Sequence, residues 1–334
     1  MKKRLVLIGA TGSVGTNVLD IVRKNPDDFT IMGLTAHTDT DALHALQHEF
    51  QPPLGVTCAV SDMSAMVCDD RVDMVVVACL GTEVREMLLA AIKHKKEIAI
   101  ATKELLVEYG HEIMREAKRN GVTILPVDSE HSGVFQLLEG NRHRTLEKIT
   151  LTCSGGPFLH ASKKMLQSAT VKQALQHPTW DMGKKISIDS ATMMNKALEI
   201  IEAHHLFDIE PENIEVLVHP QSLVHAMVHF SDGTSMAHMG HADMRIPIHY
   251  ALYYPESSDA AVPKLDLAGN ELVFEKPDTE TFPSILFAYE ALKKGGDYPK
   301  RLNRANDRAV KLFMEKKIRF DEIFQYIKEQ AFAT

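Results

Sequence analysis

The stretch "LVLIGATGSVGTNVLDIV", residues 5–22, constrains the fold more than any other part of the chain. It joins an apolar run typical of a strand to a glycine-rich turn and then to the start of a helix. Gly9, Gly12 and Gly15 are spaced GxxGxxG, one residue looser than the usual dinucleotide-binding pattern. Glycines at such a turn let the backbone approach a pyrophosphate, which binds the N–H groups of the new helix. The sequence therefore predicts a nucleotide-binding unit at the start of the fold.

Short apolar runs and helical patterns alternate through the first third of the chain. The expected strands are 5–8, 30–34, 74–78, 97–101 and 123–125. Helical patterns such as 84–94 and 109–120 lie between them. Such alternation predicts parallel βαβ units covered by helices on both faces, and we expect an N-terminal Rossmann-like parallel sheet.

Composition excludes several classes of protein. With 334 residues, 45% of them hydrophobic, the chain can bury a large core. The formal net charge of −8 and the lack of a basic run argue against nucleic acid as a partner. No apolar stretch approaches membrane-spanning length, and a glycine turn follows the first apolar run too soon for a signal peptide. Four cysteines without a CxxC pair predict reduced thiols in a cytoplasmic protein.

The pattern changes after the first third. Strands are expected at 146–151, 215–218, 223–230 and 235–239, with a hairpin turning at Asp232-Gly233, and the clearest later helices are 285–293 and 305–316. We expect four parts: a nucleotide-binding Rossmann-like domain (1–125), a central α+β domain (126–254) that contains the loop 177–187, a linker (255–279) and a small C-terminal helical domain (280–334). This last domain is expected to be short.

The second strand bears on the choice of cofactor. Its sequence "FTIMGLTAHTD" has no Asp or Glu at the tip to bind a ribose 2′-hydroxyl. Thr35, His37 and Thr38 stand there instead and could tolerate a 2′-phosphate. The pattern favours NADP, although Asp39 is close and no Arg or Lys is.

Two acids follow the strand in "ILPVDSEHSGVFQLL", residues 124–138. Residues i and i+2 at a strand end point the same way, so Asp128 and Glu130 are expected to converge. Two such acids repel each other unless a proton or a cation lies between them. The alternative is that both are solvated loop acids or cap the helix that follows.

A third acid comes from a helix in "KISIDSATMMNKALEIIEAHHLF", residues 185–207. Its apolar stripe consists of Met194, Leu198 and Ile201. The polar stripe beside it consists of Asn195, Glu199 and Glu202, with Lys196 adjacent. Acids in the middle of a helix indicate an inward-facing site, and acids without cysteine suit Mg²⁺ or Mn²⁺.

Polar side chains near this helix could bind a phosphate. The proposed set is Ser154, Ser190, Asn195 and Lys196, with the Gly155-Gly156 backbone. Each serine alone could instead cap an ordinary turn. Trp180, the only tryptophan, lies in the loop "HPTWDMGKKIS" and is either a lid that excludes water or a hydrophobic plug.

Six stretches together resemble one family. They are "PVDSEHSGVFQ", "LTCSGGPF", "HPTWDMGKKISIDSATMMNKALEIIEAHHLF", "VHPQSLVHAMV", "ADMRIPIHYALYYP" and "LDLAGNELVFEKPDTETFP". In order and over most of the chain, they are similar to the 1-deoxy-D-xylulose 5-phosphate reductoisomerase family. The resemblance implies a homodimeric, NADPH-dependent enzyme of non-mevalonate isoprenoid synthesis, which isomerises and reduces this sugar phosphate to 2-C-methyl-D-erythritol 4-phosphate.

The resemblance also implies roles for individual residues. The metal would be held by Asp128, Glu130 and Glu199. The substrate would contact Ser129, Ser154, His177, Trp180, Ser190, Asn195 and Lys196, with His177 beside its phosphate and Trp180 and Met182 in a flexible lid. The cofactor phosphates would contact Thr11, Gly12, Ser13 and Val14. Lys103 and Glu104 match a pair that joins the cofactor and substrate sites, and with Glu130 they are the expected catalytic residues. The proton could be carried either by Glu130 or by a metal-bound water, and the sequence does not decide between them.

The chain departs from the family pattern in three places. Thr102 replaces an asparagine expected near the nicotinamide ribose. Glu83, Arg85 and Glu86 stand where the family has a Gly-rich apolar turn, and the region 50–73 looks shortened. Near the C-terminus "LNRANDRAV" introduces charges, and we expect the chain to omit the last family helices. Two alternatives therefore stay open: a non-catalytic paralogue that binds a sugar phosphate or nucleotide, and a semialdehyde dehydrogenase with Cys153 as nucleophile.

Overall fold

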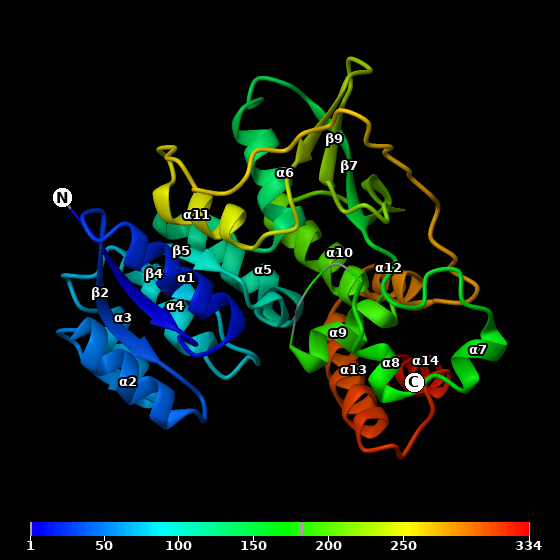
Figure 1. Cartoon of the computed structure of the whole chain (residues 1–334), viewed down its shortest axis with the longest axis horizontal. Helices are drawn as coiled ribbons and strands as arrows, with labels where there is room; N and C mark the ends of the chain where they lie inside the picture. The colour runs from blue at the N-terminus through cyan, green and yellow to red at the C-terminus, as the bar shows by residue number, and fades with distance from the viewer. Residues whose placement is uncertain (1, 179, 181–182, 334) are drawn as a thin grey trace. The chain divides into compact units, whose positions relative to one another are not determined.

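The structure is a computed structural model that describes residues 2–178, 180 and 183–333 (Figure 1). Its contacts divide the chain into two compact units, residues 1–132 with 243–263 and residues 133–242 with 264–334. The first boundary falls inside one helix, α6 (Ser129–Glu139). Among the described residues, no helix is long and apolar enough to cross a membrane.

The first unit contains a six-stranded parallel sheet. Its strands are β1 (Lys3–Ile8), β2 (Phe29–Thr35), β3 (Val56–Thr57), β4 (Met74–Val77), β5 (Glu97–Ile100) and β6 (Ile124–Pro126), in the order β3-β2-β1-β4-β5-β6. Its helices are α1 (Ser13–Lys24), α2 (Thr40–Phe50), α3 (Val60–Val67), α4 (Arg85–Lys93), α5 (Lys103–Asn120) and α11 (Arg245–Tyr253). The expected Rossmann-like fold is confirmed, because strand order reverses beside β1 as it does in doubly wound sheets.

Helix α5 begins six residues before the expected start. The pattern at 109–120 is helical, but the helix starts at Lys103 and passes through a non-helical residue at Tyr109 (φ −136°, ψ 16°). Tyr109 and Gly110 interrupt the apolar periodicity, which concealed the first segment. This earlier start puts Lys103 and Glu104 in the first turn of the helix, directly after β5.

Helix α11 belongs to the first unit, whereas the sequence grouped its residues with the catalytic domain. It packs against α1 and β6. Tyr253 meets Phe29 edge to face at 5.0 Å between ring centroids, and its hydroxyl donates to Asp28 at 2.5 Å. These contacts join residues more than 200 positions apart, so local patterns could not have revealed them.

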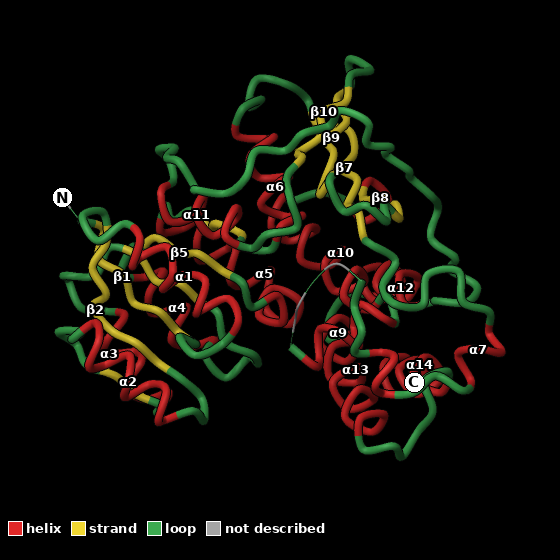
Figure 2. The backbone as a smooth tube through the Cα atoms, viewed as in Figure 1, coloured by secondary structure: helices red, strands yellow, loops and turns green. Residues whose placement is uncertain are grey.

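The second unit contains a four-stranded mixed sheet and most of the remaining helices. The strands are β7 (Leu146–Cys153), β8 (Ile214–Val218), β9 (Val224–Phe230) and β10 (Ser235–Met239), in the order β10-β9-β7-β8 (Figure 2). The helices are α7 (Lys163–Gln167), α8 (Val171–Ala174), α9 (Lys184–Ala191), α10 (Met194–Phe207), the 3₁₀ turn η1 (Pro211–Asn213), α12 (Ser284–Lys294), α13 (Tyr298–Met314) and α14 (Glu322–Phe332). The expected hairpin is present, since β9 and β10 pair antiparallel around Asp232-Gly233.

Helix α10 lies at the centre of the second unit and packs against α9, α12 and α13. Helix α13 begins at Tyr298 rather than at the expected residue 305. A proline such as Pro299 is favourable in the first turn of a helix. The prediction missed this start because charged residues hide the helical periodicity there. Residues 264–274 form no helix or strand, and Glu275 makes one isolated antiparallel bridge with Val218. The C-terminal helices thus support the helix that carries Asn195, Lys196 and Glu199.

Candidate active site

The glycine turn between β1 and α1 is shaped for close backbone contact. Gly9 has φ +91°, and a Cβ there would lie 2.5 Å from the Ala78 carbonyl oxygen. A Cβ on Gly15 would lie 2.2 Å from the Gly9 carbonyl oxygen. Gly12 is different: it is exposed, its nearest neighbour would be 3.5 Å away, and it caps α1 without a side-chain hydrogen bond. The N-terminus of α1 at Gly12 and Ser13 therefore faces open space, and it fits a pyrophosphate.

The tip of β2 is only partly as expected. Thr35 is 1% exposed, and its hydroxyl accepts a hydrogen bond from the Gly9 N–H at 3.2 Å, so Thr35 supports the glycine turn and is not available to a 2′-phosphate. His37 and Thr38 are exposed. Asp39 caps α2 by accepting from the Ala42 N–H at 3.0 Å, and this bond directs its carboxylate towards the helix.

Thr102 links the ends of two neighbouring strands. Its hydroxyl donates to the Cys79 carbonyl oxygen at 2.6 Å, and the side chain is buried. Burial raises the pKa of the Cys79 thiol to about 11, so this thiol stays protonated at neutral pH. The departure at Thr102 thus has a local structural role at the carboxyl edge of the sheet, where cofactors bind in doubly wound folds.

Lys103 forms a buried ion pair with the first acid of the candidate metal site. Its Nζ lies 2.6 Å from Asp128 Oδ2, and the two side chains are 8% and 14% exposed. Glu104, the next residue of α5, is also buried. The pairing follows from topology, since α5 starts after β5 and Asp128 follows β6, the neighbouring strand.

Asp128 and Glu130 do converge, but by a different route from the expected one. Strand β6 ends at Pro126, and α6 begins at Ser129, so Glu130 lies in the first turn of a helix rather than on a strand. One carboxylate oxygen of each acid lies within 4.8 Å of the other. The Ser129 hydroxyl donates to Glu130. An oxygen-only pair at this spacing fits a hard divalent cation.

His131 is a neighbour of this site that sequence reasoning missed. It is 0% exposed, and its Nδ1 lies 3.9 Å from Asp128 Oδ2. The "DSEH" sequence contained the signal, because a residue three positions after a helix cap lies beside the cap.

Glu199 presents a buried carboxylate on α10. Asn195 Nδ2 donates to its Oε1, and Lys196 Nζ pairs with its Oε2. Glu199 and Lys196 are 1% and 2% exposed. Of the four polar residues that the sequence placed on this helix, Asn195 and Lys196 both contact Glu199 one turn further on. The fourth, Glu202, is also buried.

Ser154 and His177 form a polar pair next to Trp180. The Trp180 backbone N–H donates to His177 Nδ1 at 2.9 Å, so in the neutral ring the proton sits on Nε2. Nε2 then donates to Ser154 Oγ, 3.0 Å away. Burial lowers the pKa of His177, which favours this neutral form. Trp180 is half-buried, and Met182 lies outside the described residues.

Ser190 is the second-last residue of α9 and lies close to the turn that follows β7. Gly155 and Gly156 have positive φ, and a Cβ on Gly156 would lie 2.7 Å from the Ser190 carbonyl oxygen. This contact requires glycine and joins the segment carrying Ser154 to the segment carrying Ser190. Hydroxyl and imidazole groups of Ser154 and His177 thus lie on a segment that contacts the end of α9, and hydrogen-bond donors of this kind suit a phosphate.

Family comparisons agree over nearly the whole chain. Residues 124–207 match the 1-deoxy-D-xylulose 5-phosphate reductoisomerase C-terminal domain, residues 239–332 match the DXP reductoisomerase C-terminal domain, and residues 5–66 and 53–110 match 1-deoxy-D-xylulose 5-phosphate reductoisomerase. The chain is 44% identical to the 1-deoxy-D-xylulose 5-phosphate reductoisomerase of Clostridium perfringens, covering 98% of this chain and 91% of the relative. It is 46% identical to that of Acetivibrio thermocellus, with 98% and 92% covered.

Solved structures of similar proteins have the same fold. A DOX-P reductoisomerase in complex with NADPH, fosmidomycin and magnesium superposes with a TM-score of 0.94 at 37% identity, covering 99% of this chain and 90% of the other. The 1-deoxy-D-xylulose 5-phosphate reductoisomerase of Zymomonas mobilis in complex with NADPH gives a TM-score of 0.88 at 36% identity, with 98% and 91% covered.

Proposed function

The chain belongs to the 1-deoxy-D-xylulose 5-phosphate reductoisomerase family, and on this premise we propose how its own residues carry out the reaction. The enzyme is an NADP-dependent oxidoreductase that also requires a divalent metal. It isomerises 1-deoxy-D-xylulose 5-phosphate and reduces the product to 2-C-methyl-D-erythritol 4-phosphate. The observation that carries the residue assignment is the pair of carboxylates at the start of α6, which share a site with the buried ammonium of Lys103.

We assign the metal to Asp128, Glu130 and Glu199. Asp128 and Glu130 supply oxygen ligands at a spacing that fits one ion, and Glu199 is the buried acid of α10 at the matching family position. The choice of Mg²⁺ or Mn²⁺ follows from the absence of sulfur in this set. When bound, the cation supplies Lewis-acid polarisation of the substrate ketone and stabilises negative charge that develops there.

Around this set, the protein positions and moves protons. Lys103 offsets the negative charge of Asp128 and so reduces the repulsion between Asp128 and Glu130. Ser129 orients the Glu130 carboxylate, and we assign the proton transfer of the isomerisation to Glu130. Glu104, buried beside Lys103, contacts both the cofactor and the substrate in this proposal.

The substrate phosphate is assigned to the donor set of the second unit. It consists of Ser154, His177, Ser190, Asn195 and Lys196, with Ser129 at the other end of the substrate. His177 already donates from Nε2, so it can transfer this hydrogen bond from Ser154 to a phosphate oxygen. Lys196 contributes the positive charge that a dianion needs in a buried site. Trp180, next to His177, would cover the bound phosphate and exclude water.

The cofactor is assigned to the first unit. The pyrophosphate would bind at the open N-terminus of α1, through Gly9, Thr11, Gly12, Ser13, Val14 and Gly15. His37 and Thr38 are exposed where a 2′-phosphate would lie, which supports NADPH over NADH. Thr102 and Glu104 lie at the carboxyl edge of the sheet, near the expected nicotinamide ribose. The bound nicotinamide supplies the hydride.

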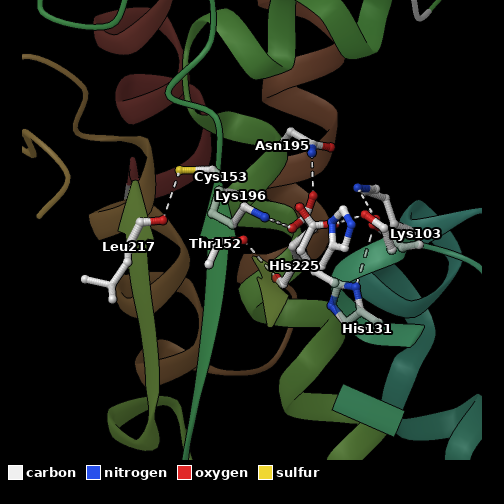
Figure 3. Close-up of polar contacts among 12 residues, drawn as sticks. Lys103, His131, Thr152, Cys153, Asn195, Lys196, Leu217 and His225 are labelled. Atoms are coloured by element: carbon white, nitrogen blue, oxygen red, sulfur yellow. Dashed lines mark hydrogen bonds and ion pairs between the residues drawn. The ribbon is translucent and has the colours of Figure 1, made fainter. Parts of the chain in front are cut away.

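Two alternatives followed from the sequence: a binding-only paralogue and a semialdehyde dehydrogenase with Cys153 as nucleophile. The family and the structure favour neither. Family membership favours catalysis over a binding-only paralogue. Cys153 ends β7 with its thiol directed to the Leu217 carbonyl oxygen at 3.6 Å (Figure 3), a packing role rather than that of a nucleophile.

The assay follows NADPH absorbance with 1-deoxy-D-xylulose 5-phosphate and Mg²⁺ or Mn²⁺, and separately with NADH. We expect metal-dependent oxidation of NADPH that chelation abolishes. Glu199→Gln should lower kcat/KM by about 100-fold or more, because removal even of groups that only support a metal ligand costs 10- to 100-fold. The matched control is Glu212→Gln, an exposed acid in the same unit. If Glu199→Gln turns over like the control at limiting Mg²⁺, Glu199 is not a ligand.

We also propose a cytoplasmic homodimer. The four cysteines, all within the described part of the chain, form no disulfide, as expected in a reducing compartment. β10 is an edge strand whose residues 235–237 are exposed, so its backbone is available to pair with a second copy. Sedimentation equilibrium should give twice the chain mass, and Ala237→Pro, which removes an N–H on this edge, should weaken the association. A monomer at micromolar concentration would refute it.

A further inference from the structure

A buried hydrogen bond joins α9 to α13 one residue before Ser190. Asn306 Nδ2 donates to Asp189 Oδ1 at 2.8 Å, and the residues are 0% and 2% exposed. The other oxygen of this carboxylate, Oδ2, lies 3.2 Å from Lys185 Nζ, which also lies 3.2 Å from Asp307 Oδ1. Asp189 therefore links α9 firmly to the C-terminal helices.

A second buried bond holds the chain on the other side of Ser190. The Ser284 hydroxyl of α12 donates to the Thr192 carbonyl oxygen at 2.7 Å, and both residues are 0% exposed. Between the two bonds, the Ser190 carbonyl packs against Gly156. The turn from α9 into α10, with Ser190 and Asn195 on either side, is thus fixed from α12, from α13 and from the segment after β7.

Burying the carboxylate of Asp189 is costly unless its hydrogen bonds are specific and complete. An apolar residue could have filled the same space between two helices. A directional bond does what apolar packing does not, since it fixes the separation and rotation of α9 relative to α13. Asp189 belongs to neither the metal set nor the substrate set, so its role must act through its neighbours.

We propose that Asp189 and Asn306 are positioning residues for the substrate phosphate. Their bond sets the place of Ser190 and of the start of α10, and through it the C-terminal helices contribute to substrate binding. This inference rests on the proposed assignment of Ser190 and Asn195 to the substrate.

The test compares Asp189→Asn, Asn306→Asp and the double variant in which the two residues are exchanged. Readouts are the KM for 1-deoxy-D-xylulose 5-phosphate, the inhibition constant of inorganic phosphate and the KM for NADPH. Each single variant should raise the first two constants about tenfold, the effect of losing one good hydrogen bond. Asn306→Asp replaces the amide donor by a second carboxylate, and Asp189→Asn leaves only one oxygen for two donors, Asn306 Nδ2 and Lys185 Nζ. The KM for NADPH should stay within twofold. The exchange rebuilds an amide–carboxylate bond of opposite polarity and should recover most of the loss.

Asp307→Asn is the matched control, because it makes the same chemical change one residue further along α13. Its carboxylate is 50% exposed, and such ion pairs contribute little, so we expect all constants within twofold of the parent. The proposal is overturned if Asp189→Asn has a lower unfolding midpoint but an unchanged KM for the sugar phosphate and an unchanged inhibition constant for inorganic phosphate. The bond would then contribute only to the stability of the fold. A parallel rise in the KM for NADPH would overturn it too.

Ser190→Ala distinguishes the positioning role of Asp189 and Asn306 from the assignment of Ser190 to the substrate phosphate. An unchanged phosphate constant in Ser190→Ala refutes Ser190 as a substrate residue. A raised constant there, with parent values in Asp189→Asn, refutes only the positioning role. If two facing carboxylates prevent Asn306→Asp from folding, Asp189→Asn and the exchange variant carry the comparison.

Discussion

Replacing glycine by alanine at two positions of the glycine turn should have different effects: Gly15→Ala should mainly lower stability, and Gly12→Ala should mainly weaken NADPH binding. In Gly15→Ala, the new Cβ would lie 2.2 Å from the Gly9 carbonyl oxygen and 2.8 Å from backbone atoms of Ala10. Those atoms cannot retreat freely, because Gly9 and Ala10 donate to the Thr35 carbonyl oxygen at 3.2 and 2.7 Å. Overpacking of this kind costs about 1–3 kcal/mol or more, whereas replacing a helical glycine by alanine gains at most about 1 kcal/mol. We expect a net loss of about 2 kcal/mol in the free energy of unfolding.

In Gly12→Ala, the nearest atom would be 3.5 Å away, and φ −79° with ψ 171° suits alanine. The expected loss of stability is only about 0.5–1 kcal/mol, the cost of alanine at a helix N-cap. The methyl group would occupy space that the pyrophosphate needs, so the dissociation constant for NADPH should rise about tenfold or more. Urea unfolding and NADPH fluorescence titration measure the two effects separately. Gly12→Ala with parent NADPH affinity, or Gly15→Ala with parent stability, would refute this reasoning.

Three further predictions concern side chains of the site. Burial lowers the pKa of His177, so the unfolded chain takes up this proton at a higher pH than the folded protein does. The free energy of unfolding therefore decreases as pH falls below about 6.5. Between pH 7 and 5 the unfolding midpoint of His177→Gln should fall less than that of the parent, and an equal fall in both proteins would contradict the prediction. Lys103→Met should lower the free energy of unfolding by about 3 kcal/mol, because it leaves the Asp128 carboxylate without its ammonium, and Mg²⁺ should recover part of that loss; no recovery would argue against a cation at Asp128. Trp180→Ala should raise the KM for the sugar phosphate at constant unfolding midpoint, and an unchanged KM would make Trp180 a hydrophobic plug.

The sequence predicted those parts of the fold whose cause is local. Strong apolar runs and the glycine turn gave the strands of the first sheet, and Asp232-Gly233 gave the hairpin, because turn chemistry acts over a few residues. The early starts of α5 and α13 were missed where Tyr109 and a run of charged residues obscured helical periodicity. The place of α11 depends on contacts with residues far away in sequence, which no local pattern encodes.

The candidate site shows the same division. The three polar residues of α10 could be read from helical spacing, and the structure brings them together. Asp128 and Glu130 were correctly expected to converge, although the reason is a helix start rather than a strand end. Thr35 was wrongly considered for a 2′-phosphate, because burial beneath the glycine turn cannot be seen from a strand tip. The Lys103–Asp128 ion pair could not be predicted from residue patterns, because it depends on β5 and β6 being neighbouring strands.

The cap that Asp39 provides for α2 limits how cofactor preference can change during evolution or engineering. An acid near the tip of β2 is the usual means of selecting NADH, but this one is already committed to a helix terminus. Redirecting it towards a ribose would expose the first N–H groups of α2, so selection for NADH should introduce a new acid at His37 and leave Asp39 in place.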